Sequence, residues 1–240
     1  MQMLENIFLP GGFKVFRILR NHFQFTDKVV LLIGAGSEMI AEKILNAGAK
    51  SVRMIVDDFD SLMNAKLGIK NKNQIDIRIM DFHTTDFSSN EFDLIYAQAS
   101  ISSHNRNKIV KEIKRILKQE GTFCVGELTA LTKTYPTFVR DIFGSSEILP
   151  LNHDECSKYY RNHGFEIHYE QDLSSSLKNF YENAALELEK ITKLLTEQEK
   201  SYYKKLLNKI SHESNAYLNL GADKYIGLKM LTLKLSGSAS

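Results

Sequence analysis

Residues 29–36 read Val-Val-Leu-Leu-Ile-Gly-Ala-Gly, and this stretch decides the fold. A run of five apolar residues is typical of a buried strand, and the Gly-x-Gly after it allows a tight turn in which a ligand can lie against the backbone. Ser37 is able to cap a helix that starts directly after the turn, and Gly48 suits the end of that helix. The stretch therefore predicts a strand, a glycine turn and a helix, in that order.

Composition narrows the class of protein. The 240 residues with 43% hydrophobic content suffice for one α/β domain with a sizeable core. Lys and Arg number 31 against 29 Asp and Glu, and this net charge of +2 gives no electrostatic sign of a nucleic-acid partner. No apolar run approaches the roughly 20 residues that span a bilayer. We expect a cytoplasmic protein with a small-molecule partner, no nucleic acid and no membrane, and a homodimer stays open.

The cysteine pattern argues against two further classes. The chain has only Cys124 and Cys156, which form no Cys-x-x-Cys pair. A disulfide framework and a structural zinc site both need more cysteines at closer spacing. We expect no metal site.

Apolar periodicity predicts the other elements. The expected strands cover residues 28–33, 52–56, 75–80, 92–97, 122–125, 165–169 and 226–235. The expected helices cover residues 13–19, 37–48, 60–67, 107–119, 155–162, 176–195 and 197–218, and a short amphipathic segment at residues 4–9 precedes the first. Five strands with four intervening helical segments favour a parallel sheet with helices on both faces.

The chain reads as a single domain over residues 1–235, followed by a flexible tail at 236–240. Within it we expect an N-terminal helical cap over 1–25, a cofactor-binding core over 26–130 and a helical insertion over 173–222.

Polar or minimal side chains follow four successive strands. Since ligands bind at the carboxyl ends of parallel strands, these positions predict a site there. They are Gly34, Ala35 and Gly36, Asp57 and Asp58, Asp81 and Phe82, and Gln98. Asp57 is placed to accept hydrogen bonds from two ribose hydroxyls, and Asp81 to accept one from an adenine amino group with Phe82 beside the ring. The set predicts a cofactor that carries adenosine, although Asp58 also suits the N-terminus of the next helix.

From Thr26 to Gly121 the chain resembles the class I methyltransferases that use S-adenosyl-L-methionine. The resemblance rests on the glycine turn, the acid after the second strand, Asp81, and residues 113–121, Ile-Lys-Arg-Ile-Leu-Lys-Gln-Glu-Gly, which are similar to a family signature. It implies a Rossmann-like, seven-stranded, mostly parallel sheet whose last strand is antiparallel, with a helical insertion before that strand. It also implies S-adenosyl-L-methionine as cofactor and methyl transfer to a small molecule.

Two positions depart from the family pattern. Leu32 stands where members carry an acid that helps hold the amino-acid end of the cofactor, and Ser37, Glu38 and Met39 stand where a third small residue follows. Glu38 either supplies the missing carboxylate or repels the carboxylate of the cofactor.

The chemistry that the family implies is in-line displacement at a sulfonium methyl group, for which alignment matters more than a base. Weak candidates for a base are His104, Tyr135 and His153, with Cys156 nearby, and each also has a purely structural interpretation. Two alternatives remain. One is a degenerate member that binds a metabolite or a protein without methyl transfer. The weaker one is an NAD-dependent oxidoreductase, because the glycine turn and Asp57 also suit NAD.

Overall fold

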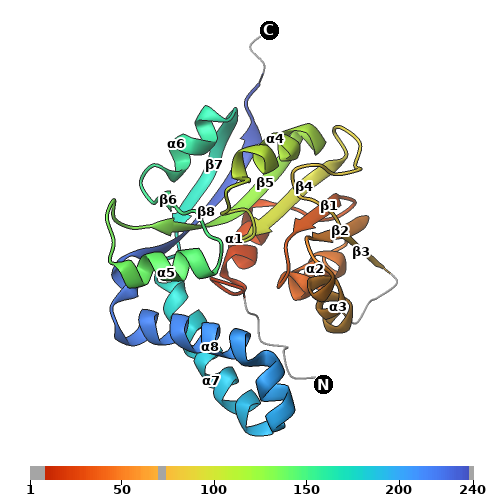
Figure 1. Ribbon diagram of the computed structural model, residues 1–240. Helices are drawn as coiled ribbons and strands as arrows, with labels where there is room; N and C mark the ends of the chain where they lie inside the picture. The colour runs from red at the N-terminus through yellow and green to blue at the C-terminus, as the bar shows by residue number, and fades with distance from the viewer. Residues whose placement is uncertain (1–8, 70–73, 238–240) are drawn as a thin grey trace.

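The computed structural model describes residues 9–69 and 74–237, so the predicted amphipathic segment, except for Leu9, and the last three residues of the tail lie outside the described part. Figure 1 shows strands and helices alternating along most of the chain. The helices are α1 (Lys14–His22), α2 (Glu38–Asn46), α3 (Phe59–Gly68), α4 (Arg106–Ile116), α5 (Thr137–Ser145), α6 (Cys156–Asn162), α7 (Ser176–Leu194) and α8 (Glu197–Asn219), with a 3-10 turn η1 (Ala222–Lys224). The strands are β1 (Val29–Ile33), β2 (Ser51–Val56), β3 (Ile75–Ile79), β4 (Phe92–Gln98), β5 (Leu117–Ala130), β6 (Leu151–Asn152), β7 (Phe165–Asp172) and β8 (Ile226–Leu235).

The strands form one sheet in the order β3-β2-β1-β4-β5-β8-β7, and β6 pairs with β5. The strands β1 to β5 are parallel to one another. The last strand, β8, is antiparallel to both β5 and β7. The predicted fold class is confirmed, with the two-residue strand β6 as an eighth strand that the sequence did not indicate.

Helices cover both faces of the sheet and create two buried clusters. Val15, Ile44 and Leu177 belong to the cluster under α1, α2 and α7. Ile113 and Tyr160 belong to the cluster under α4 and α6. Because both faces of the central strands are covered, those strands read as continuous apolar runs instead of alternating ones.

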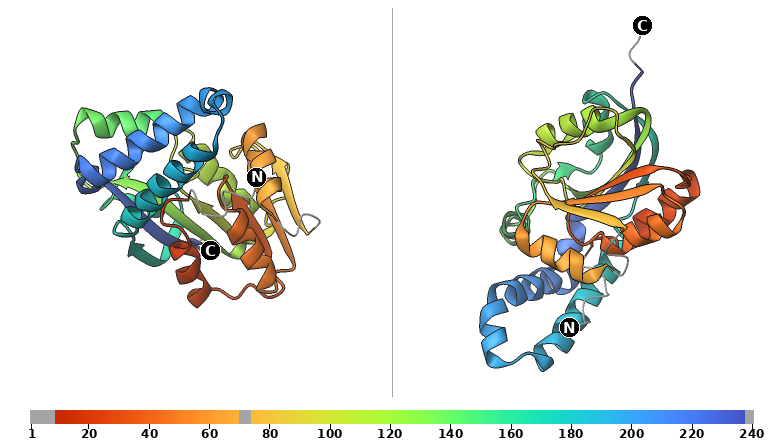
Figure 2. Two further views of the ribbon diagram at one scale, coloured as in Figure 1. Left: turned by 90° about the horizontal axis from the view of Figure 1, so that it is seen from below. Right: turned by 90° about the vertical axis from the view of Figure 1, so that its right-hand side faces the viewer.

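The helices α7 and α8 form the predicted insertion and extend away from the sheet at one end, as Figures 1 and 2 show. The strand β8 follows them directly and runs against the parallel strands. Its first residue therefore lies at the carboxyl edge of β5, where Ala130 pairs with Ile226. This places the insertion at the edge of the sheet where the candidate site was expected. Within the described residues, no helix is long and apolar enough to cross a membrane.

Two predictions about local structure were wrong, and one helix was not predicted. Turns, not a fourth helical segment, join β3 to β4. The helix α4 ends at Ile116, three residues early, because Leu117 already pairs with Phe92 in the sheet. The pairing then skips to Leu94 and Thr122, so the intervening residues bulge out of the ladder instead of ending a helix. Finally, α5 lies in a region for which no element was predicted.

Candidate functional site

The glycine turn at the end of β1 has a backbone that requires glycine. Gly34 has a φ of +99°, and its N–H donates to the carbonyl of Ile55 at 2.9 Å. A Cβ atom on Gly34 would lie 2.2 Å from the Cβ of Ser100 in the segment after β4. The turn is thus shaped by close approach of a neighbouring loop as well as by its own conformation.

The residues after the turn satisfy its polar groups from within. The hydroxyl of Ser37 donates to the carbonyl of Gly34 at 2.9 Å, so it does not cap α2 with its side chain as predicted. The Oε1 atom of Glu38 accepts a hydrogen bond from the N–H of Gly36 at 3.0 Å. A free N–H at this place, in front of a helix, would be an anion site. Here the carboxylate of Glu38 already occupies it.

Leu32 faces the core and not the turn. Its side chain is fully buried in the cluster under α1 and α2, and in the sheet it lies between Met54 and Tyr96. The position at which family members carry an acid is therefore filled here by a core side chain. Gly48 takes a φ of +92° after α2, as the sequence predicts for a helix end.

The two acids after β2 have different partners. Asp58 accepts a hydrogen bond from the N–H of Ser61 at 2.8 Å and caps α3, which lowers the pKa of Asp58. Asp57 is an exposed residue, but partial burial of its carboxyl raises its pKa, and the charges of Asp58 and Glu147 raise it further. Of the two, Asp57 is the one whose carboxylate is not committed to a helix cap.

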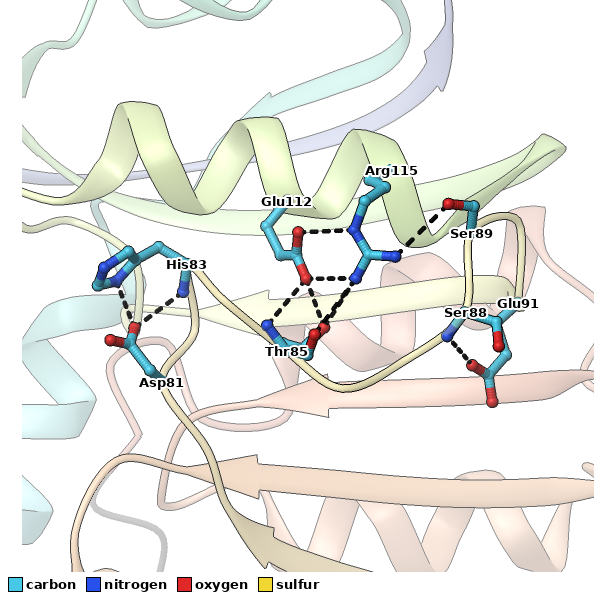
Figure 3. Close-up of polar contacts among 8 residues, drawn as sticks. All are labelled: Asp81, His83, Thr85, Ser88, Ser89, Glu91, Glu112 and Arg115. Atoms are coloured by element: carbon cyan, nitrogen blue, oxygen red, sulfur yellow. Dashed lines mark hydrogen bonds and ion pairs between the residues drawn. The ribbon is translucent and has the colours of Figure 1, made fainter.

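The segment after β3 is fixed to α4 by a polar network (Figure 3). Glu112 accepts hydrogen bonds from the guanidinium of Arg115 at 2.6 and 2.9 Å and from the N–H of Thr85 at 2.9 Å. Burial raises the pKa of Glu112, but the bonds from Arg115 and Thr85 outweigh burial and lower it to about 2. Arg115, part of the stretch that resembles a family signature, thus holds the segment that connects β3 to β4.

The same segment carries Asp81 and Phe82. The Oδ1 atom of Asp81 accepts a hydrogen bond from the N–H of His83 at 3.0 Å and pairs with its ring. Phe82 is 8% exposed and packs into the cluster under α4. Little of its ring surface is left to lie beside a cofactor ring, whereas Asp81 remains exposed.

Gln98 holds the start of the described chain against the end of β4. Its amide nitrogen donates to the carbonyl of Pro10 at 2.5 Å and to that of Gly12 at 3.1 Å, while its amide oxygen accepts from the hydroxyl of Tyr96. Both N–H donors of the amide are used in these bonds. The side chain is 2% exposed and acts as an anchor for the segment before α1.

The four weak candidates for a base are spread over different surroundings. His104 is exposed in the turn before α4, and the ring of Tyr135 packs edge-on against Phe143 at 5.4 Å. Cys156 is fully buried, which raises the pKa of its thiol. The structure does not bring these three residues together.

His153 has the most specific environment of the four. Its Nδ1 atom lies 2.8 Å from the hydroxyl of Thr129 and its Nε2 atom 3.7 Å from Asp172. Burial lowers the pKa of His153 in spite of the neighbouring carboxylate, so the imidazole is neutral at neutral pH. Within the described residues, no group of three or more His, Cys, Asp and Glu side chains is arranged to hold a metal ion.

Two features of the site were missed by sequence reasoning. The hydroxyl of Ser100, the residue that lies over Gly34, is buried and has no hydrogen-bond partner in the described structure. Glu127 is fully buried near the end of β5, where it pairs with Arg106 at 3.1 Å and accepts hydrogen bonds from Ser102 and Tyr160. The signal for Glu127 was present, since a charged residue follows the apolar run at 123–126 and needs a partner if the strand is buried.

The cradle for an adenosyl cofactor is therefore present in part. The glycine backbone, the unpartnered hydroxyl of Ser100 and the carboxylate of Asp57 fit such a group. The bond between Glu38 and Gly36 must open, or be accommodated, for the amino-acid end of the cofactor.

Comparisons with known proteins agree with this geometry. Residues 31–125 match the family model described as "Methyltransferase domain". Among curated proteins no sequence matches the chain. Solved structures match at 11–18% identity, a level that shows the fold.

Three of these structures illustrate the range. One is a "putative sarcosine dimethylglycine methyltransferase" from Galdieria sulphuraria. It has a TM-score of 0.70 and 13% identity, and the match covers 92% of this chain and 84% of its own. The [4+2]-cyclase SpnF has a TM-score of 0.72 and 18% identity over 93% and 81%. Phosphoethanolamine N-methyltransferase 2 from Haemonchus contortus, in complex with phosphomonomethylethanolamine and S-adenosylhomocysteine, has a TM-score of 0.73 and 16% identity over 95% and 54%. Residues 31–125, which include the glycine turn and strands β2 to β4, thus resemble a methyltransferase domain in sequence, and the strand order of the sheet is that of the Rossmann-like methyltransferase fold.

Proposed function

We propose that this chain transfers a methyl group from S-adenosylmethionine to a small-molecule acceptor. The observation that carries the proposal is the backbone of Gly34, which lies under Ser100 at the end of β1, one strand away from the exposed residue Asp57. A glycine turn at one strand end and an acid at the next are the two places where an adenosyl cofactor needs the protein most.

The residues present would divide the work of holding the cofactor. The backbone between Gly34 and Gly36 would lie along it, and Asp57 would accept hydrogen bonds from its ribose hydroxyls. When bound, S-adenosylmethionine supplies a methyl group on a positively charged sulfur, which makes that carbon a good electrophile. The chain then has to align the acceptor and exclude water, and it needs no nucleophile of its own.

The walls of the acceptor site would come from three segments at the carboxyl edge of the sheet. These are the opening segment through α1, the region at residues 129–154 and the insertion at residues 174–224. His153 stands in the second of them, but Thr129 and Asp172 lie next to its two ring nitrogens. We therefore assign catalysis to alignment and leave the base unassigned.

Calorimetric titration with S-adenosylhomocysteine tests the cofactor site. We expect binding by the wild-type chain and a loss of at least tenfold in affinity for Asp57→Asn, because the amide accepts from only one of the two hydroxyls. Asp60→Asn, an exposed acid in the first turn of α3, is the matched control and should bind as the wild type does. Absence of binding by the wild type at millimolar cofactor or product would overturn the proposal.

A second function is favoured by one observation. Glu38 occupies the N–H of Gly36 and Leu32 fills the usual acid position, as expected for a degenerate member that binds a metabolite or a protein without methyl transfer. The match to a structure described as a [4+2]-cyclase supports it at the level of the fold. Transfer of labelled methyl from S-adenosylmethionine to any member of a small-molecule pool would exclude it.

The family match leaves the NAD hypothesis without support, and an absorbance change at 340 nm with pooled substrates would revive it.

A further inference from the structure

A groove of about 1300 Å³ lies along α1. Its walls are α1, the last turn of α2 and the first turns of α7, elements seen near one another in the left view of Figure 2. Gly34, Gly36 and Asp57, which belong to the candidate cofactor site, do not line it. Three residues at the end of α2 do. Those three are Lys43, Asn46 and Ala47.

The charge of the groove has one sign. Lys14, Arg17, Arg20 and Lys43 line it, and among the lining residues that the structure describes there is no Asp or Glu. The whole chain is nearly balanced, with 31 basic and 29 acidic residues, so four cations without an acid are a local excess. Within residues 9–69 and 74–237, none of the four makes an ion pair. Unpaired cations so close together repel one another until an anion joins them.

Aromatic rings form a second part of the groove, beside small and uncharged polar residues. Phe13, Phe23 and Phe180 line it and are only partly buried, which leaves part of each ring open to a ligand. The ammonium group of Lys43 stands 4.9 Å from the centre of the Phe13 ring, which joins the two kinds of surface. A concave surface that offers several cations and exposed rings recognises a molecule with an anionic head and an apolar body.

We propose that this groove is a second binding site, which takes an amphiphilic anion with a phosphate-like head and an alkyl or ring body. The arginines bind the head through paired N–H donors, and the phenylalanines cover the body. A free metabolite and the headgroup region of an anionic lipid share this chemistry. The groove shares α1 and the start of the insertion with the segments that would wall the acceptor site, whereas Gly34 and Asp57 are not among its lining residues, so binding in the groove and binding of the cofactor can be measured separately.

Octyl phosphate below its micelle concentration is the probe, compared with octyl glucoside and with inorganic phosphate. We expect octyl phosphate to bind in calorimetry at least tenfold more tightly than either comparison compound, and to raise the melting temperature as its concentration increases. Co-sedimentation with phosphatidylglycerol vesicles, compared with phosphatidylcholine vesicles, assigns the head to a lipid. Binding of octyl phosphate without co-sedimentation assigns it to a free molecule. Equal binding of octyl phosphate and octyl glucoside would overturn the proposal.

Paired substitutions separate the groove from general surface charge. Arg17→Gln with Arg20→Gln should weaken octyl phosphate at least tenfold. Lys108→Gln with Lys111→Gln removes two exposed cations at the same spacing from α4, which packs on the other cluster, and should leave binding unchanged. Both double variants should bind S-adenosylhomocysteine as the wild type does, so failure of either proposal is visible separately. Equal losses of affinity for octyl phosphate in the two double variants, or no loss in the first, would overturn the proposed binding site.

Discussion

The carboxylate of Glu38 and the N–H of Gly36 are joined by a hydrogen bond of 3.0 Å, so the chain places its own anion at the glycine turn. Glu38 is the first residue of α2, where the helix dipole favours negative charge. The bond thus stabilises the turn in the free protein. The amino-acid end of the cofactor, which carries a carboxylate of its own, has to compete with it.

Removal of the charge at position 38 should strengthen cofactor binding. Glu38→Gln keeps an oxygen that accepts from Gly36 but removes the negative charge, and at the dielectric constant of water two charges about 4 Å apart interact by about 1 kcal/mol. We expect S-adenosylhomocysteine to bind about fivefold more tightly in calorimetry. Glu120→Gln, at an exposed acid in the bulge of β5, is the control and should bind as the wild type does. Weaker binding by Glu38→Gln would mean that Glu38 is the missing cofactor ligand.

An acid at position 32 should destabilise the fold and should not improve cofactor binding, because Leu32 is fully buried between Met54 and Tyr96. We expect Leu32→Asp to lower the free energy of unfolding by about 3 kcal/mol or more at neutral pH, since an ionised carboxylate loses its hydration there. The pKa of the new carboxyl would be raised in the folded state, so the loss should shrink as pH falls from that raised value to the unfolded value of about 4. Urea titration at pH 7 and pH 4 measures it, with Leu32→Val as the control. A stable variant with tighter cofactor binding would contradict this prediction.

The contact between Gly34 and Ser100 can be tested by a double-mutant cycle. Gly34→Ala combines a φ of +99° with a clash at 2.2 Å, and should lower the free energy of unfolding by about 3 kcal/mol. Ser100→Gly removes the clashing Cβ, so the double variant should recover all but about 1 kcal/mol, the cost of the backbone conformation. Gly144→Ala, where a Cβ meets nothing within 4 Å in α5, should be neutral or stabilising. Additive losses of stability would show that contact with Ser100 is not the reason why Gly34→Ala destabilises the fold.

Periodicity and strand spacing predicted most of the fold correctly. The limits of β8 at residues 226 and 235 were predicted to the residue, because a long apolar run flanked by polar residues has clear ends. The boundary between α4 and β5 was misplaced, because sheet pairing of Leu117 with Phe92 is a long-range contact that local sequence does not encode. The helix α5 was overlooked although Val139, Ile142 and Phe143 recur at helical spacing.

The site was predicted less completely than the fold. Strand ends located Gly34 and Asp57 correctly in the topology, but the roles of neighbouring side chains depend on partners far away in sequence. The amide of Gln98 donates to the carbonyls of Pro10 and Gly12, and the ring of Phe82 packs in the core. No local pattern could have indicated that Ser100 lies over the glycine turn, because this contact exists only after β1 and β4 pair.

The bond network of Glu112 should make stability depend on acid pH. Its pKa is about 2 in the folded protein against 4.5 for the free side chain, so it stabilises the fold above pH 4.5, and this contribution is lost as pH falls towards 2. Partial exposure of Arg115 reduces the contribution at pH 7 to about 2 kcal/mol. We expect Glu112→Gln to lose this amount at pH 7 and to unfold with a flatter pH dependence. Asp86→Asn, at an exposed acid of the same segment, should retain the wild-type profile in urea titrations between pH 7 and pH 3.

The buried pair of Glu127 and Arg106 should position the loop that covers the glycine turn. Glu127 binds Ser102 as well as Arg106, and Ser102 lies two residues after Ser100. Glu127→Ala leaves Arg106 buried without its partner and should cost about 4 kcal/mol of the free energy of unfolding. Glu127→Gln keeps the bond to Ser102 and the fold, and should weaken S-adenosylhomocysteine several-fold because the loop is held less firmly. Tyr160→Phe removes only one hydroxyl bond to Glu127 and serves as the control, with an expected loss near 1 kcal/mol and unchanged affinity. If Glu127→Gln were as stable as the wild type and bound the product equally well, the pair would have no part in holding the loop.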